Sequence, residues 1–288
     1  MKILISGGGG FIGSELKNFL SKENEVFTVG KSDCNTIQVD LIEGGFRTNE
    51  NFDFIIHTAA IVHNKIHASS FNNELLNKDL TITNNLISSI NPSSIKYGII
   101  YISSVSVYGI ESGVNISEDE KVNPKSSYAK AKYLNELIIK KWSINNNKFY
   151  YLLRLPLVYG KNPKGNLKDV AIAIKKNLFF KIKHNDSLKS TLFINDLNEQ
   201  IIKIIKSKNS GVYNLVSKNI KFNSIINMIE RDIDKKSFFL PKKFIFIVFS
   251  LLGFIPVLKR KFNIHVYNKM TSSLTFDNSK SINKLKWN

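Results

Sequence analysis

A cluster of glycines directly after the first predicted strand constrains the fold of this chain more than any other feature. Residues 3–6 read as a buried strand, and four consecutive glycines follow it. Gly7, Gly10 and Gly13 are spaced three residues apart, and a helix is predicted over residues 11–21. Glycine has no Cβ atom, so backbone N–H groups can approach a diphosphate, and the helix directs its positive dipole end at the same anion. The pattern predicts a nucleotide-binding turn, although a purely structural turn would also use glycine.

A second group of residues indicates proton-transfer chemistry. Residues 101–109 end a predicted strand with three serines, and Tyr128 and Lys132 follow about twenty residues later. Residues four apart share one face of a helix, so these two side chains would point into the same space. A neighbouring ammonium group stabilises a phenolate, and we expect Lys132 to lower the pKa of Tyr128 from its ordinary value of about 10. The alternative is a lysine-rich surface helix, because residues 125–141 hold five lysines.

The order of predicted elements is typical of an α/β protein with a doubly wound parallel sheet. Strand patterns alternate with helical patterns, and the predicted strands are residues 2–6, 25–29, 36–39, 54–57, 98–103 and 149–153. After Gly160 the elements become shorter, which indicates a smaller second lobe. The chain of 288 residues begins with its first strand and holds one cysteine, Cys34. We therefore expect a cytoplasmic protein without a signal peptide or intramolecular disulfide.

Together these motifs resemble the extended short-chain dehydrogenase/reductase superfamily, in the nucleotide-sugar branch known as the NAD-dependent epimerase/dehydratase family. Residues 6–13 are similar to the family's T-G-G-x-G-F-I-G. Further segments that resemble the family are Asp40-Leu41, His57-Thr-Ala-Ala60 and residues 154–160, 190–197, 272–277 and 285–287. The resemblance implies a catalytic triad in which Tyr128 exchanges a proton with a sugar oxygen, Ser104 hydrogen-bonds that oxygen and Lys132 holds the cofactor ribose.

The motifs and the resemblance also give the expected contacts and domains. The expected cofactor-binding residues are Gly7, Gly10, Phe11, Ile12, Gly13, Lys31, Ser32, Asp40, Leu41, His57, Ala59, Ala60, Tyr128 and Lys132. The expected substrate-binding residues are Ser104, Ser106, Asn166 and Lys189, the last two at the substrate diphosphate. We expect an NAD(P)-binding Rossmann domain over residues 1–160, completed by about 191–216. Residues 161–190 and 217–288 would form the nucleotide-sugar-binding lobe.

The reaction is narrowed to hydride transfer without dehydration. The family's 4,6-dehydratases carry Thr-Asp-Glu where this chain has Ser104-Val105-Ser106, which offers no additional acid or base. One hydride transfer would make a 4-ketoreductase, and two would make a 4-epimerase. Residues 154–166, with Lys189 and the apolar segment near the C-terminus, resemble a subgroup from bacterial surface-polysaccharide pathways that holds both activities. Leu157 stands where many family members have Asn, which weakens a direct transfer from the best-known 4-epimerases.

The residues after the second predicted strand favour NADPH and hence a reductase. An NAD enzyme usually places a carboxylate there for the ribose 2′-hydroxyl, whereas this chain has Gly30-Lys31-Ser32, which could bind a 2′-phosphate. Asp33 is close enough to keep NAD open. We expect a UDP- or dTDP-linked 4-keto-6-deoxyhexose, in particular a 2-acetamido sugar, as substrate. The alternative is a 4-epimerase of a UDP-hexose or UDP-N-acetylhexosamine.

Other classes of function are less well supported. The net charge of +18 comes from scattered lysines without a nucleic-acid-binding motif, and an acidic substrate and cofactor account for part of it through steering. His57, His63 and His67 lie close together in the sequence, but no cysteine or paired carboxylates join them. A catalytic metal would need a third protein ligand at a defined geometry, so no metal is expected. A non-catalytic cofactor-sensing protein is the distant alternative, and the intact triad argues against it.

A basic and apolar segment over residues 242–261 has two interpretations. Its uncharged run, residues 244–258, is shorter than the roughly 20 residues of a spanning helix and is interrupted by Gly253 and Pro256. The first interpretation is a lobe helix that packs on the core or on a second subunit of a homodimer. The second is a monotopic contact with an anionic membrane, since lysines and arginines flank the run.

Overall fold

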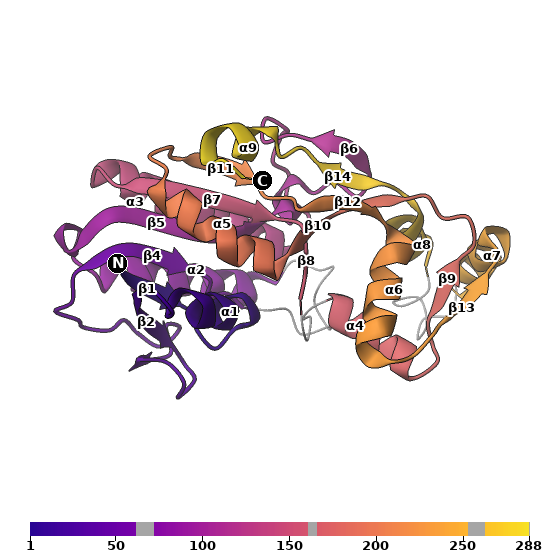
Figure 1. Ribbon diagram of the computed structural model, residues 1–288, viewed down its shortest axis with the longest axis horizontal. Coiled ribbons are helices and arrows are strands. Elements are labelled where there is room, and N and C mark those ends of the chain that lie inside the picture. The colour runs from indigo at the N-terminus through magenta and orange to yellow at the C-terminus, as the bar shows by residue number, and fades with distance from the viewer. Residues whose placement is uncertain (62–71, 161–165, 253–262, 288) are drawn as a thin grey trace.

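The computed structural model describes residues 1–61, 72–160, 166–252 and 263–287, and these form the predicted α/β fold with a doubly wound sheet (Figure 1). Seven parallel strands are ordered β11-β7-β5-β4-β1-β2-β3. Their bounds are β1 (Lys2–Ser6), β2 (Glu25–Gly30), β3 (Ile37–Gln38), β4 (Phe52–His57), β5 (Ile95–Ser104), β7 (Phe149–Leu155) and β11 (Gly211–Asn214). The inner strands are nearly continuous apolar runs because helices cover both faces of the sheet.

Helices on the two faces of this sheet enclose two hydrophobic cores. On one face lie α1 (Phe11–Leu20) and α5 (Ile194–Lys206), and on the other lie α2 (Asn73–Ser88) and α3 (Ser127–Asn145) (Figure 1). The strand order reverses between β1 and β4, since chain order runs from β1 toward β3 on one side and from β4 toward β11 on the other. A crevice at the carboxyl ends of strands beside such a reversal is where α/β folds bind ligands.

A second lobe is built around a smaller sheet of order β12-β10-β14-β6, to which β8 adds beside β10. Its strands are β6 (Gly113–Ile116), β8 (Leu157–Tyr159), β10 (Leu188–Phe193), β12 (Lys218–Lys221) and β14 (Leu274–Phe276), and a separate pair joins β9 (Phe180–Ile182) to β13 (Phe238–Leu240). The helices here are α4 (Asn166–Lys175), α6 (Phe222–Ile233), α7 (Lys242–Leu252) and α8 (Ile264–Thr271). The elements after Gly160 are mostly short, as the sequence predicted.

The chain passes between the two lobes more often than the sequence suggested. Strands β6 and β8 fall within the range 1–160 expected for the cofactor domain, yet they pair in the second sheet. The C-terminal helix α9 (Ser279–Leu285) returns to the large sheet, and Trp287 is buried there with its Nε1 donating to the Val216 carbonyl at 2.8 Å. Lys286 adopts a φ of 55°, a left-handed backbone conformation that favours glycine. The predicted domain boundaries remain a prediction.

Candidate active site

The glycine turn after β1 is shaped as the sequence predicted. Gly7 has a φ of +76°, and a Cβ atom on it would lie 2.8 Å from backbone atoms of Ala59. A Cβ atom on Gly13 would lie 2.2 Å from the Gly7 carbonyl oxygen, so neither position accepts a side chain. Helix α1 starts at Phe11 with Gly10 as N-cap, no side-chain cap and no acidic residue in its first turn. The turn and the helix start therefore fit a diphosphate.

The two residues expected at the adenosine end of the cofactor are bound to each other. The Lys31 ammonium donates to Asp40 Oδ2 at 2.8 Å, which raises the pKa of Lys31 and lowers that of Asp40. The Lys31 side chain is 82% exposed. Ser32 lies against the glycine turn, because a Cβ atom on Gly9 would be 2.7 Å from its Oγ. Leu41 is buried in the core between the sheet and α2.

The side chain of His57, at the end of β4, is buried and has a structural role. Its Nδ1 lies 2.6 Å from Ser6 Oγ and its Nε2 lies 2.9 Å from Thr83 Oγ1. Burial, and then the charge of Lys132, lower the pKa of His57 to about 3, so it is neutral. Ala59 and Ala60 follow it and are half-buried beside the glycine turn. Any contact of His57 with a cofactor would therefore use its backbone.

The three expected catalytic residues come together from two elements. Ser104 ends β5 and caps the short 3₁₀ helix η2 (Val105–Tyr108) by accepting from the Ser106 N–H at 3.2 Å. Tyr128 and Lys132 lie one turn apart in α3, which begins after Ser126, whose Oγ accepts from the Ala129 N–H. The Ser104 side chain lowers the pKa of Tyr128, and the Lys132 ammonium lies 5.9 Å from the centre of the Tyr128 ring.

The expected lowering of the Tyr128 pKa by Lys132 is wrong for this structure. Burial and then the Asp79 carboxylate raise the pKa of Tyr128 to about 12, and the Ser104 side chain opposes this shift. The Lys132 ammonium donates instead to the Ile102 carbonyl at 2.8 Å and lies 4.8 Å from the centre of the Tyr101 ring. Burial lowers the pKa of Lys132, against Asp79 and Glu136. Tyr128 is thus held in its protonated form near neutral pH.

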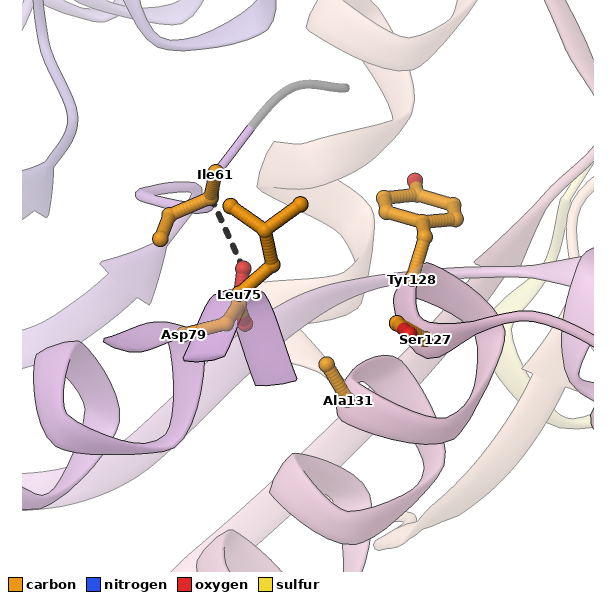
Figure 2. A pocket seen from close by; sticks show the side chains of 6 residues that line it. All are labelled: Ile61, Leu75, Asp79, Ser127, Tyr128 and Ala131. Carbon is orange, nitrogen blue, oxygen red and sulfur yellow. Dashed lines mark hydrogen bonds between the residues drawn. The ribbon is translucent and has the colours of Figure 1, made fainter. Parts of the chain in front are cut away.

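Asp79 was missed by sequence reasoning and lies beside the triad. It lines a small pocket with Tyr128, Ser127, Ala131, Ile61 and Leu75 (Figure 2). Its carboxylate is almost fully buried and accepts from the Ile61 N–H at 2.8 Å and from Asn135 Nδ2 at 2.7 Å. The signal was an aspartate at helical spacing within a row of apolar residues, since Leu76, Ile82 and Leu86 share its buried face of α2.

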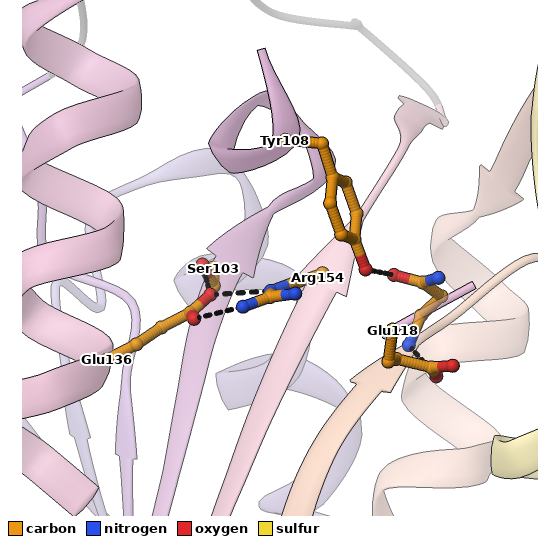
Figure 3. A network of polar contacts seen from close by, with 6 residues as sticks. Ser103, Tyr108, Glu118, Glu136 and Arg154 are labelled. Atoms are coloured by element: carbon orange, nitrogen blue, oxygen red, sulfur yellow. Dashed lines mark hydrogen bonds and ion pairs between the residues drawn. The ribbon is translucent and has the colours of Figure 1, made fainter. Parts of the chain in front are cut away.

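A buried ion pair anchors the helix of Tyr128 and Lys132 to the sheet. Arg154 of β7 donates from Nε and Nη2 to the Glu136 carboxylate of α3, at 3.1 and 2.7 Å (Figure 3). Ser103 donates to the same carboxylate at 2.5 Å, next to Ser104. Burial works to lower the pKa of Arg154, but the hydrogen bonds and charge of Glu136 raise it overall. The network fixes the serine strand end relative to α3.

The same network continues toward the second lobe. The Arg154 guanidinium stacks on the Tyr108 ring, whose hydroxyl donates to Asn214 Oδ1 at 2.8 Å. The Asn214 backbone N–H donates to Glu118 at 2.7 Å, and burial raises the pKa of Glu118 (Figure 3). Residues of β7 and β11 are thereby tied to η2, which precedes β6, and to the chain that follows β6.

The expected substrate contacts are only partly assembled. The Ser106 Oγ is buried and has no hydrogen-bond partner among the described residues, so it could receive a ligand polar atom. The Lys189 ammonium on β10 donates to the Ser272 carbonyl at 2.5 Å, and burial lowers its pKa to about 8. Asn166 begins α4. The substrate roles of these residues remain predictions.

The expectation that the chain binds no metal remains a prediction. Among the described residues, no three His, Cys, Asp or Glu side chains gather as metal ligands. His63 and His67 lie outside the described residues.

Comparison with known proteins identifies the family. The sequence model of the NAD-dependent epimerase/dehydratase family matches residues 3–215, so the chain belongs to this family. It is therefore an NAD(P)-dependent enzyme of that family, and the glycine turn fits its nicotinamide cofactor.

The individual relatives named here share less than 30% sequence identity with this chain. The chain is 24% identical to a putative UDP-glucose 4-epimerase of Methanocaldococcus jannaschii, over 80% of this chain and 82% of the relative. It is 28% identical to GDP-6-deoxy-D-talose 4-dehydrogenase of Aggregatibacter actinomycetemcomitans, over 71% of this chain and 70% of the relative. The structure of RMD from Pseudomonas aeruginosa complexed with NADPH superposes with a TM-score of 0.72 at 17% identity, covering 100% of this chain and 93% of that one. This last likeness concerns the fold.

Proposed function

We propose that this member of the NAD-dependent epimerase/dehydratase family is an NADPH-dependent 4-ketoreductase of nucleotide sugars. Its substrate is a UDP- or dTDP-linked 4-keto-6-deoxyhexose, in particular a 2-acetamido sugar. The observation that carries the proposal is that Ser104 and the protonated Tyr128 lie together at the carboxyl end of β5, where residues 105 and 106 add no further acid or base. A phenol held in this form donates a proton, which is what reduction of a ketone requires.

The chemistry follows from the geometry of the triad. Bound at the glycine turn, the nicotinamide would supply the hydride that reduces the C4 carbonyl carbon. Tyr128 gives its hydroxyl proton to the carbonyl oxygen, and the Ser104 hydroxyl hydrogen-bonds the same oxygen. The phenolate that remains takes a proton back from solvent. Residues 105 and 106 offer no acid or base that could expel water, which supports reduction without dehydration.

The preference for NADPH rests on the end of β2. Gly30 brings no carboxylate to the position beside the ribose, and the exposed Lys31 ammonium could meet a 2′-phosphate. Its pairing with Asp40 is a surface ion pair, which a doubly charged phosphate can displace at little cost. The relative named as a 4-dehydrogenase of a nucleotide-linked 6-deoxy sugar supports redox chemistry at C4.

A 4-epimerase is the second candidate, and two observations favour it. The Asp40 carboxylate accepts from the Lys31 ammonium at 2.8 Å and would neutralise its charge. The same carboxylate could then accept a hydrogen bond from a ribose hydroxyl of NAD, in place of the contact between Lys31 and a 2′-phosphate. The relative from Methanocaldococcus jannaschii is named as a putative UDP-glucose 4-epimerase. The same triad would then first act as a base, for which the phenol of Tyr128 must lose its proton.

The two candidates are separated by following cofactor and sugar together. The purified enzyme is mixed with NADPH and a panel of 4-keto-6-deoxy sugar nucleotides, and loss of NADPH absorbance is compared with product formed. The reductase oxidises one NADPH for each sugar reduced. In parallel, UDP-glucose and UDP-N-acetylglucosamine are incubated with NAD and no reductant. Formation of their C4 epimers, with no reduction of any keto sugar, would replace the reductase with the epimerase.

A further inference from the structure

The outer end of the second lobe carries an exposed apolar surface, which we call the α7 patch. Figure 1 shows α7 and β13 at the end of the molecule away from β1 and the N-terminus. The patch consists of five side chains that are 46–73% exposed: Phe238, Phe244, Phe246, Ile247 and Leu251. Three of them are phenylalanines, which favour the boundary between water and an apolar phase far more than water itself.

Helix α7 is apolar on both of its faces. Ile245 and Phe249, four residues apart, are buried against Ile182 and Tyr267 and attach the helix to the lobe. Phe244, Ile247 and Leu251, at spacings of three and four, form an opposite stripe that the lobe leaves exposed. A helix on the surface of a globular protein normally turns charged or polar residues outward, so this stripe is suited to a second apolar environment.

Basic side chains surround the patch. Lys235, Lys236, Lys242 and Lys243 are exposed beside it, and residues 235–252 contain no acidic residue. The carboxylates on adjoining elements are already paired: Glu230 with Lys181, and Asp186 with Lys221. Asp232 accepts a hydrogen bond from Tyr159, and Asp234 is exposed at the end of α6. The surface around the patch therefore has a positive charge next to exposed phenylalanines.

We propose that the α7 patch docks on an anionic lipid bilayer, with α7 lying in the plane of the interface. Phenylalanine and aliphatic side chains would enter the boundary of the acyl chains, and the lysines would contact anionic headgroups. Charge complementarity selects this occupant: a second copy of the chain would bring the same lysines against each other, which is repulsive. No helix among the described residues is long and apolar enough to cross a membrane. Residues 253–261 of the predicted segment lie outside the described residues.

The test is co-sedimentation of the full chain with vesicles. Vesicles of phosphatidylcholine alone are compared with vesicles that also contain phosphatidylglycerol, each at low and high salt. We expect binding to the anionic vesicles at low salt, little binding to phosphatidylcholine, and partial release by salt. Phe244→Gln with Ile247→Gln removes the exposed stripe with helix-forming residues and should abolish binding. Lys242→Gln with Lys243→Gln should weaken it by about tenfold or more, because each lysine near an anionic surface contributes roughly a factor of five.

A matched control replaces exposed apolar residues elsewhere. Val114→Gln with Ile282→Gln changes side chains that are 66% and 45% exposed on β6 and α9, and it should bind vesicles as the unmodified chain does. Circular dichroism melts confirm that each variant is folded, and hydride transfer should be unchanged in all of them because the patch lies outside the catalytic site. Absence of binding to anionic vesicles at low salt overturns the proposal. So does equal binding by the Phe244/Ile247 variant, or a dimer that this variant alone disrupts.

Discussion

Tyr128 is the residue on which the chemistry depends. Its pKa is raised to about 12 by burial and by Asp79, and the Ser104 side chain opposes this shift. Lys132 lies close to the ring but donates to a main-chain carbonyl. We therefore propose separable roles for the two α3 residues, Tyr128 in proton transfer and Lys132 in holding charge near the ribose.

Replacement of each residue should separate these roles. Tyr128→Phe keeps the ring but removes the hydroxyl, so cofactor affinity should be retained and kcat should fall by about 100-fold or more. Lys132→Met should weaken cofactor binding as well as the rate. Titration of cofactor fluorescence and steady-state kinetics measure both. A Tyr128→Phe enzyme that loses mainly cofactor affinity, or a Lys132→Met enzyme with normal cofactor affinity, would contradict the assigned roles.

Asp79 should control the pH range of the reaction. The reductase needs protonated Tyr128, so its rate falls as the pH rises through the pKa of Tyr128. Asp79→Asn removes a negative charge that raises this pKa, and the falling limb should move to lower pH. The measurement is kcat as a function of pH for both proteins, with Glu74→Gln on the exposed side of α2 as control. An unchanged limb in Asp79→Asn would remove the carboxylate from this role.

Lys31 should decide between the two cofactors. If its ammonium meets the 2′-phosphate, NADPH binds more tightly than NADH, and Lys31→Ala narrows the difference several-fold. Asp40→Asn frees Lys31 from its ion pair and should widen the difference. Dissociation constants from calorimetry provide the comparison. Equal affinities of the unmodified enzyme for NADPH and NADH would withdraw this support for a reductase.

At the scale of elements, α3 is attached to the sheet by buried polar residues as well as by Ile139 of the hydrophobic core. Lys132, Asn135 and Glu136 are all buried on this helix, and Glu136 forms the bidentate ion pair with Arg154 of β7. Breaking a buried pair leaves an uncompensated charge, so Glu136→Gln should lower the free energy of unfolding by about 3–5 kcal/mol. Urea denaturation measures this, and Leu137→Gln, at an exposed neighbour, should change it little. A loss no larger than in that control would show that the pair does not anchor α3.

The predictable elements were those with a strong local signal. Strand β1, the glycine turn and helix α1 followed from apolar residues and the spacing of glycines, and the structure has them within one residue of the expected bounds. Strand β5 was predicted to begin at residue 98 but begins at Ile95. The exposed Lys96 interrupts the apolar pattern at the start of this strand, and the continuous buried run begins only at Gly98. The buried face of α3 could not be recognised from apolar periodicity, since Lys132, Asn135 and Glu136 interrupt it between Ala131 and Ile139.

At the scale of the whole molecule, the sequence predicted the fold class, and the catalytic roles of Ser104, Tyr128 and Lys132 stay a prediction. Ser104 and Tyr128 are 24 positions apart in the sequence, and the packing of α3 beside the end of β5 brings them together. The charge environment was harder to predict, because Asp79 reaches Tyr128 only through the packing of α2 on α3. Likewise, the pairing of Lys31 with Asp40 depends on how β2 and β3 end beside each other.

The central claim is a single hydride transfer from NADPH to C4 of a nucleotide sugar, and isotope labelling tests it most directly. The enzyme is given a 4-keto-6-deoxy sugar nucleotide and NADPH that carries deuterium at the transferable position. Nuclear magnetic resonance then follows the C4 position of the product. The account predicts one deuterium at C4 of each product molecule and one NADPH oxidised for each. A C4-inverted UDP-sugar formed without consumption of NADPH, together with no label transfer to any keto sugar, would contradict it.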